Sequence, residues 1–161
     1  MPEILIRDAR KEDAETLLRL VKELAAFERA PDAVVATEAD YVRDGFGPER
    51  RFEAILAHVD DRPAAYAIFF PNWSTWQGRA GLYLEDIYVC EWARRYGVGR
   101  RLMRHLAGIA LARGWTRFDF QVLSWNSARH FYHALGFGHR DEWLPYRLDG
   151  EALAKFAAGE G

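Results

Sequence analysis

The spacing of hydrophobic residues along the chain changes between the period of a helix and the period of a strand. Apolar residues three and four positions apart predict one long helix that begins after Asp13 and ends before Pro31. Thr37 followed three residues later by Asp40 is a capping-box pattern, which predicts a second, shorter helix ending by Gly47. Short alternating or apolar runs predict strands at residues 4–6, 52–59, 64–70 and 82–89.

The second half of the chain repeats a strand–helix order. A helix with a clean apolar stripe is predicted from Gly97 to Gly114, followed by a strand at residues 118–123. A short helix over residues 128–135 is closed by Gly136. The segment 143–148 is predicted to be a last strand, followed by a helical tail from Glu151. Residues 71–78 are expected to form a loop that holds Trp73 and Trp76.

This order of elements predicts an α+β (mixed α/β) fold, with a central, mostly antiparallel sheet flanked by helices. The chain has 161 residues and shows no repeat, no low-complexity segment and no linker, so a single domain over residues 1–161 is expected. Half of the residues are hydrophobic and 14% are aromatic, which suffices for a packed core.

Charge and cysteine content narrow the function classes. The formal net charge of −2 gives no general attraction to nucleic acid or to an anionic membrane, and neither partner is expected. Cys90 is the single cysteine, so no disulfide forms within the chain. No apolar run is long enough to cross a bilayer, and the first residues lack a signal-peptide pattern. A cytoplasmic protein is therefore expected.

The segment from Arg94 to Arg100 carries the clearest chemical signal. Glycines allow close backbone approach, a helix N-terminus attracts anions, and arginines add positive charge. These features predict a pyrophosphate cradle. No Gly-Lys-Ser/Thr follows, so it is not a Walker P-loop, and the dinucleotide fingerprint lacks its third glycine. The plainer alternative is a glycine turn before a solvated, arginine-rich helix face.

Arg-x-x-Gly-x-Gly between a strand and a helix resembles the acetyl-CoA motif of the GNAT acetyltransferase superfamily. Asn126 and the segment 131–137 also resemble that superfamily. More narrowly, the segments 22–28 and 83–89, Trp125-Asn126 and Trp143 resemble the diamine acetyltransferases of the spermidine/spermine and thialysine type. The similarity runs over nearly the whole chain. It implies a GNAT-like fold, acetyl-CoA as co-substrate, a small-molecule amine as substrate, and a homodimer.

The resemblance implies that the pantetheine arm of acetyl-CoA pairs like an added strand with the main chain of residues 87–89. The pyrophosphate is expected on the segment 94–100. The cofactor-binding residues implied are Ile87, Tyr88, Val89, Arg94, Arg95, Tyr96, Gly97, Val98, Gly99, Arg100, Asn126 and Leu135. The stretch from Asn126 to Phe131 is one residue shorter than is usual in the family.

Amine acetylation has two proton problems. An alkylammonium, with a pKa of about 10.4, must lose a proton before it attacks, and the departing thiolate must gain one. The resemblance implies Tyr132 as general acid, and Glu85 is predicted to be the base. Alternation places Glu85 and Asp86 on opposite strand faces that both mix polarity, which indicates one functional acid without deciding which. The plainer alternatives are a packed aromatic for Tyr132 and a solvent-facing strand residue for Glu85.

Four further residues are candidates for the amine site. Glu28 resembles a substrate-ammonium contact, and Phe27 and Trp76 are candidates to wall the aliphatic part of a diamine. Core packing is the alternative for both aromatics. Thr75 stands where polyamine enzymes carry an acidic residue. The five histidines show no metal-ligand spacing, and no metal is expected.

The leading hypothesis is an acetyl-CoA-dependent N-acetyltransferase that acts on a primary amine of a small diamine, polyamine or lysine analogue. Transfer is expected to be direct, within a ternary complex. One alternative is a GNAT enzyme for another small amine, such as an amino acid or an aminoglycoside. The other is a catalytically silent acetyl-CoA-binding module.

Overall fold

The computed structural model describes residues 1–160, which form two compact units. The first is Met1–Trp125 and the second begins at Asn126. The first unit holds the sheet and three of the helices, and the second holds two short helices. The expectation of one domain over the whole chain stays a prediction.

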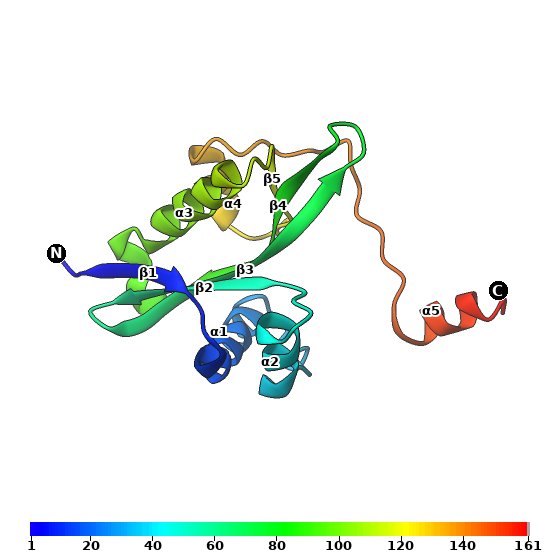
Figure 1. Cartoon of the computed structure of the whole chain (residues 1–161), viewed down its shortest axis with the longest axis horizontal. Coiled ribbons are helices and arrows are strands. Elements are labelled where there is room, and N and C mark those ends of the chain that lie inside the picture. Colours follow the sequence, from blue (N-terminus) through cyan, green and yellow to red (C-terminus); the bar gives the residue numbers. More distant parts are fainter. Residues whose placement is uncertain (161) are drawn as a thin grey trace. The chain divides into compact units, whose positions relative to one another are not determined.

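The first unit is built on a five-stranded sheet with the order β1-β2-β3-β4-β5 (Figure 1). The first four strands pair antiparallel with their neighbours along the chain, and β5 lies parallel to β4. The predicted mostly antiparallel sheet is therefore confirmed. The strands are β1 (Ile4–Asp8), β2 (Glu53–Val59), β3 (Arg62–Ser74), β4 (Arg79–Val89) and β5 (Phe118–Phe120).

Helices cover both faces of this sheet. α1 (Ala14–Phe27) and α2 (Glu38–Phe46) lie on one face and α3 (Val98–Ala112) on the other (Figure 1). Two 3₁₀ helices, η1 (Lys11–Asp13) and η2 (Glu91–Tyr96), precede α1 and α3. The capping box of α2 is confirmed, because Thr37 Oγ1 accepts from the Asp40 amide at 3.3 Å and Asp40 Oδ2 accepts from the Thr37 amide at 2.8 Å.

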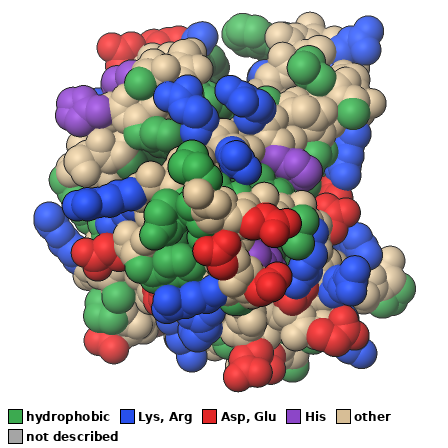
Figure 2. Space-filling model, turned by 90° about the vertical axis from the view of Figure 1, so that its left-hand side faces the viewer, with side chains coloured by type: hydrophobic (Ala, Val, Ile, Leu, Met, Phe, Trp, Pro, Cys, Tyr) green, Lys and Arg blue, Asp and Glu red, His purple; other side chains and the backbone are tan. Residues whose placement is uncertain are grey.

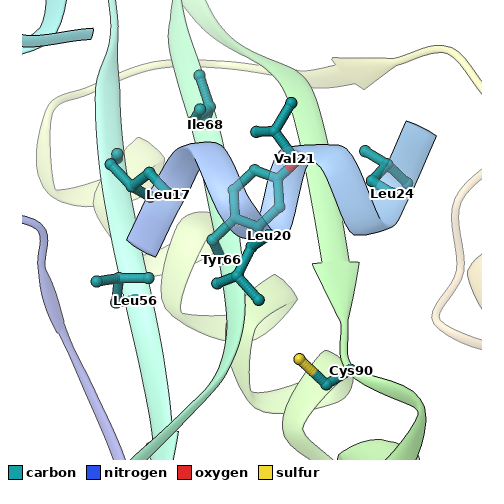
Figure 3. Packing of buried hydrophobic residues seen from close by; sticks show 9 residues of the cluster. Leu17, Leu20, Val21, Leu24, Leu56, Tyr66, Ile68 and Cys90 are labelled. Carbon is teal, nitrogen blue, oxygen red and sulfur yellow. The ribbon is translucent and has the colours of Figure 1, made fainter. Parts of the chain in front are cut away.

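The main core lies between α1 and the sheet. Leucines and a valine from α1 pack against side chains of β2 and β3 (Figure 3). Tyr66 is fully buried at the centre of this cluster. Burying each large apolar side chain contributes about 1.5–3 kcal/mol, so this interface fixes how α1 sits on the sheet. The central residues are Leu17, Leu20, Val21, Leu24, Leu56, Tyr66 and Ile68.

The predicted ends of β3 and β5 are wrong. β3 continues to Ser74, so Trp73 belongs to a strand, and the turn is confined to residues 75–78. Pro71 is tolerated there because β2 pairs with β3 only as far as Phe69, so no ladder bond on that side is lost. β5 ends at Phe120 rather than Leu123, because its pairing with β4 ends at Leu84.

The second unit contains α4 (Ala128–Ala134) and α5 (Gly150–Ala157). Gly136 closes α4 with φ of +95°, as predicted, and a left-handed residue of this kind favours glycine. The prediction of a strand over residues 143–148 is wrong, since this segment has no regular structure and is exposed. A short run rich in apolar residues does not make a strand unless a neighbouring strand satisfies the backbone hydrogen bonds.

Candidate active site

A β-bulge in β4 sets the geometry of the candidate site. Ile68 of β3 pairs with Asp86 and Phe69 pairs with Leu84, so Glu85 has no partner across the ladder. Glu85 is exposed, whereas Leu84 beside it is buried. Bulges bend a strand and change the direction of side chains, and they are common beside active sites. Here the bulge turns a carboxylate out of an apolar strand.

The edge of β4 beyond the bulge is open. The parallel pairing with β5 ends at Leu84, so β5 does not cover residues 85–89. Cys90 donates its amide to the Ala64 carbonyl of β3 at 2.8 Å. Because main-chain groups alternate between the two sides of a strand, those of Val89 and Ile87 face away from β3, toward the open side. The N–H and carbonyl of Tyr88, which the sequence also predicts to contact the pantetheine arm, face β3.

The predicted pyrophosphate segment has more regular structure than a glycine loop. Arg94, Arg95 and Tyr96 lie in η2, and Gly97 then takes φ of +73° before α3 begins. Such a φ favours glycine, which explains its position between the two helices. The first helical bond runs from the Arg101 amide to the Gly97 carbonyl, so the preceding α3 amides have no acceptor within the helix.

The start of α3 suits an anion. Its first turn contains no acidic residue, no side chain caps it, and Arg100 is exposed there. Val98 is fully buried and anchors the turn. Free amides, the positive end of the helix dipole and nearby guanidinium groups together attract phosphate. Arg95 and Tyr96 are exposed beside this turn.

Arg94 points along β4. Its Nε donates to the Val89 carbonyl at 3.2 Å, and its guanidinium lies 5.0 Å from the Phe27 ring centre and 5.9 Å from that of Tyr88. A carbonyl oxygen accepts two hydrogen bonds, so Val89 keeps capacity for a second donor. Arg94 thereby links the open strand edge to the end of α1.

A buried carboxylate lies next to the bulge. Tyr66 donates its hydroxyl to Asp86 Oδ2 at 3.2 Å. Burial first, and then the charge of Glu85, raise the pKa of Asp86 to about 6, although the Tyr66 hydrogen bond opposes this. The charge of Glu28 contributes in the same direction, and burial raises the pKa of Glu28 as well. Three carboxylates thus gather at one place, which suits a cationic amine.

Other groups respond to this acidic cluster, which comprises Glu28, Glu85 and Asp86. Burial raises the pKa of Tyr41 to about 12, with a smaller contribution from Asp86. Burial and Asp86 also raise the pKa of Tyr66. Both phenols therefore stay protonated at neutral pH. Tyr66 is then available as a permanent hydrogen-bond donor to Asp86.

Phe27 ends α1 and is 39% exposed, so its ring is partly available to a ligand. Its ring centre lies 6.4 Å from that of Trp125. Arg29 covers the other ring of this pair, with its guanidinium carbon 3.9 Å from the Trp125 ring centre. These contacts form an aromatic–arginine cluster, which comprises Phe27, Arg29, Arg94 and Trp125.

Thr75 and Trp76 lie in the turn between β3 and β4. Trp76 is 88% exposed, so its indole lies mainly in solvent in this chain. The structure therefore does not place Trp76 against Phe27. The aromatic partner of Phe27 is Trp125, which the sequence associated with the family motif but not with the substrate wall.

The remaining predicted site residues belong to the second unit. Tyr132 is half-buried on α4, and its ring lies 5.4 Å from Phe131 and 6.4 Å from Phe137, measured between ring centres. Asn126 Oδ1 accepts from the Ala128 amide at 2.9 Å, which fixes the start of α4. The Leu135 amide donates to the carbonyls of Phe131 and Tyr132, each at 3.1 Å.

Two site features were missed at the sequence level. The alternation pattern left Glu85 and Asp86 equivalent, because a bulge is a property of the pairing with β3 and not of β4 alone. Arg29 could not be predicted as a site residue, since its left-handed backbone and its contact with Trp125 depend on tertiary structure. The apolar context of Leu84-Glu85-Asp86-Ile87 was the available clue to the acidic cluster.

The surface carries charges of both signs. On the face drawn in Figure 2, basic and acidic side chains are interspersed, and hydrophobic side chains are exposed between them. Within residues 1–160, no group of three or more His, Cys, Asp or Glu side chains is arranged to hold a metal ion. None of the helices in that range is both long and apolar enough to span a membrane.

Sequence and structure comparisons find similar proteins that cover nearly the whole chain. Thialysine N-epsilon-acetyltransferase of Sus scrofa is 34% identical over 98% of this chain and 99% of its own length. Spermidine/spermine N(1)-acetyltransferase-like protein 1 of Homo sapiens is 34% identical over 94% of this chain, which spans 23% of that protein. An integron cassette protein of V. cholerae superimposes with a TM-score of 0.81 at 27% identity, covering 96% of this chain and 97% of its own.

The sequence profile of the acetyltransferase (GNAT) family matches residues 9–137, which include the bulged strand, the start of α3 and α4. Members of this family use acetyl-CoA as the acetyl donor. The chain therefore belongs to the GNAT acetyltransferase family and is an acyl-CoA-dependent N-acetyltransferase.

Proposed function

We propose that the protein transfers an acetyl group from acetyl-CoA directly to a primary amine of a small diamine, polyamine or lysine analogue. The observation that carries this proposal is the acidic cluster at the end of an open strand edge. Glu85 and Asp86 lie at the bulge, and Glu28 is close enough to raise the pKa of Asp86. A carboxylate cluster attracts an alkylammonium, and the open edge suits an amide-containing arm.

The residues that would hold acetyl-CoA belong to two neighbouring segments. The outward main-chain groups of Ile87 and Val89 offer strand-like hydrogen bonds to the pantetheine arm. The amides at the start of α3 and the guanidinium of Arg100 offer a site for the pyrophosphate. Asn126 and Leu135 are proposed as further cofactor contacts because the sequence resembles the family at these positions. The positive charge of these groups suits the pyrophosphate, and the free main-chain groups suit the amides of the pantetheine arm.

Acetyl-CoA supplies the activated acyl group, and the protein moves protons. Glu85, directly or through a water, accepts one proton from the substrate ammonium, which frees the nitrogen lone pair. The amine nitrogen then bonds to the acetyl carbon, and the carbon–sulfur bond breaks as Tyr132 donates its phenolic proton to the sulfur. The nitrogen's second proton restores the phenol, so the products are an amide, a thiol and one proton.

Phe27 and the carboxylate cluster favour a substrate with an aliphatic arm and a positive end. Trp76 and Thr75, in the turn between β3 and β4, are also proposed substrate contacts. Because Trp76 is almost fully exposed within one chain, its contact would require a second surface. The proposed homodimer supplies such a surface, and the exposed aromatic segment 143–156 is the proposed region of exchange between subunits.

A panel of amines tests the proposed function. With acetyl-CoA in excess, we expect thiol release with diamines, polyamines or lysine analogues and none with alcohols of the same length. An aminoglycoside and an α-amino acid without a side-chain amine serve as comparisons, because Thr75 removes one negative charge that a polyamine would use. Selective turnover of either comparison compound would favour the alternative that the enzyme acetylates another small amine. Binding of acetyl-CoA without turnover of any amine would favour a silent binding module.

Arg100→Ala tests the proposed pyrophosphate site. Removing one charge-assisted contact to phosphate is expected to raise the KM for acetyl-CoA about tenfold, while kcat changes less than threefold. Arg104, also basic and exposed on α3 but one turn further along, provides the matched control as Arg104→Ala. Steady-state kinetics with acetyl-CoA varied give both constants. Equal effects of the two substitutions would contradict a specific role for Arg100.

A further inference from the structure

Arg29 adopts a backbone conformation that disfavours its own side chain. It follows the last turn of α1 with φ of +63°, in the left-handed region that favours glycine. The Arg29 amide donates to the Ala26 carbonyl at 3.1 Å and the Ala30 amide to the Ala25 carbonyl at 2.8 Å. This is the Schellman pattern, in which glycine usually occupies the Arg29 position. An arginine at a strained position indicates a role for its side chain.

The Arg29 side chain lies on the aromatic–arginine cluster. Its guanidinium carbon lies 3.9 Å from the ring centre of Trp125, and the Trp125 ring contacts Phe27. A guanidinium that packs over a ring keeps its N–H donors at its edge. Within the described residues, Arg29 has no acidic side chain at ion-pair distance. Its donors therefore suit an external anion.

Two residues of opposite charge follow one another at the end of α1. Glu28 belongs to the acidic cluster, and Arg29 is the next residue along the chain. A diamine or polyamine would bring its second ammonium toward a guanidinium, which costs binding energy. A diamino acid carries a carboxylate that pairs with a guanidinium through two parallel hydrogen bonds.

We propose that Arg29 binds the α-carboxylate of a diamino acid substrate of the lysine or ornithine type, and thereby selects it over the diamine that lacks this group. The side-chain ammonium would lie at the acidic cluster and the carboxylate at the edge of the Arg29 guanidinium. This inference rests on the proposed amine acetylation. It narrows the proposed substrates to diamino acids and names the residue that recognises their carboxylate.

Matched substrate pairs isolate the carboxylate. L-lysine and cadaverine differ only in this group, as do L-ornithine and putrescine. In the unaltered protein, kcat/KM is expected to be higher for the amino acid of each pair. Arg29→Gly should lower kcat/KM about tenfold to a hundredfold for the amino acids and leave it unchanged or raised for the diamines. Because glycine suits this backbone, the variant should be at least as thermally stable as the parent.

Arg62→Gly is the control, since Arg62 also stacks on a tryptophan, 4.2 Å from the Trp92 ring centre. It should leave the preference within each pair unchanged. Equal losses for amino acid and diamine in Arg29→Gly would overturn the inference while the proposed function stands. A rise in the KM for acetyl-CoA alone would also overturn it, by assigning Arg29 to a cofactor phosphate. Failure of the unaltered protein to acetylate any of the four compounds would overturn the proposed function itself.

Discussion

Tyr132→Phe is expected to lower kcat by about a hundredfold to ten-thousandfold while the affinity for acetyl-CoA stays nearly unchanged. A positioned general acid contributes a rate factor of this size, because the leaving thiolate otherwise takes its proton from water. Phenylalanine keeps the ring that packs between Phe131 and Phe137. The substitution therefore removes one hydroxyl group and preserves the packing of α4. Single-turnover rates and acetyl-CoA titration measure the two quantities separately.

Tyr146 provides the control for this substitution. It lies in the same unit, and phenylalanine keeps the ring that the segment 143–156 would present to a second subunit, so Tyr146→Phe should leave both kcat and affinity unaltered. A slower but measurable Tyr132→Phe enzyme should also respond more strongly to leaving-group acidity, since a better thiolate needs less protonation. If Tyr132→Phe retains full activity, the phenol is not the acid. A loss confined to acetyl-CoA binding would instead make Tyr132 a cofactor contact.

The positions of most helices and strands along the chain were predictable because they depend on local periodicity. The α1 stripe, the Thr37–Asp40 capping box and the glycine at position 97 each express a local rule, and each is confirmed. The parallel pairing of β4 with β5 follows from the helix between them. The length of β3 did not follow from the sequence, because Pro71 interrupts a strand only where a neighbouring strand needs an N–H at that position, and β2 does not reach that far.

The candidate site was predictable in composition and not in arrangement. The sequence located two adjacent acids in an apolar strand, but the bulge at Glu85 arises from the register with β3. The pKa of Asp86 depends on burial against Tyr66 and on the charges of Glu85 and Glu28. No spacing rule reports these tertiary quantities. Similarly, the exposed segment 143–148 has the residue pattern of a strand but no neighbour to pair with.

Asp86→Asn is expected to stabilise the protein at neutral pH. The pKa of this carboxyl is about 6 in the folded protein, mainly through burial, against about 3.9 for an unperturbed aspartate in the unfolded chain. Between these values the folded protein binds a proton that the unfolded chain does not. The free energy of unfolding therefore falls as pH rises through this window, and the full penalty remains above pH 6.

Asparagine removes the charge and keeps an oxygen that can accept the Tyr66 hydrogen bond. The free energy of unfolding at pH 7.5 should accordingly rise by about 1–3 kcal/mol relative to the parent, and the difference should vanish near pH 4. Urea unfolding at both pH values measures this. Asp32→Asn, at an exposed position, controls for loss of one surface charge. An equal gain at both pH values would contradict the titration of Asp86 as its cause.

The same substitution should weaken binding of a cationic amine, because one of three carboxylates at the site becomes neutral. A gain in stability together with a higher amine KM is the signature of a group retained for function at a cost to the fold. If Asp86→Asn stabilises the protein and leaves amine kinetics unchanged, Asp86 supports only the bulge. The amine would then depend on Glu85 and Glu28, and the trade-off would be absent.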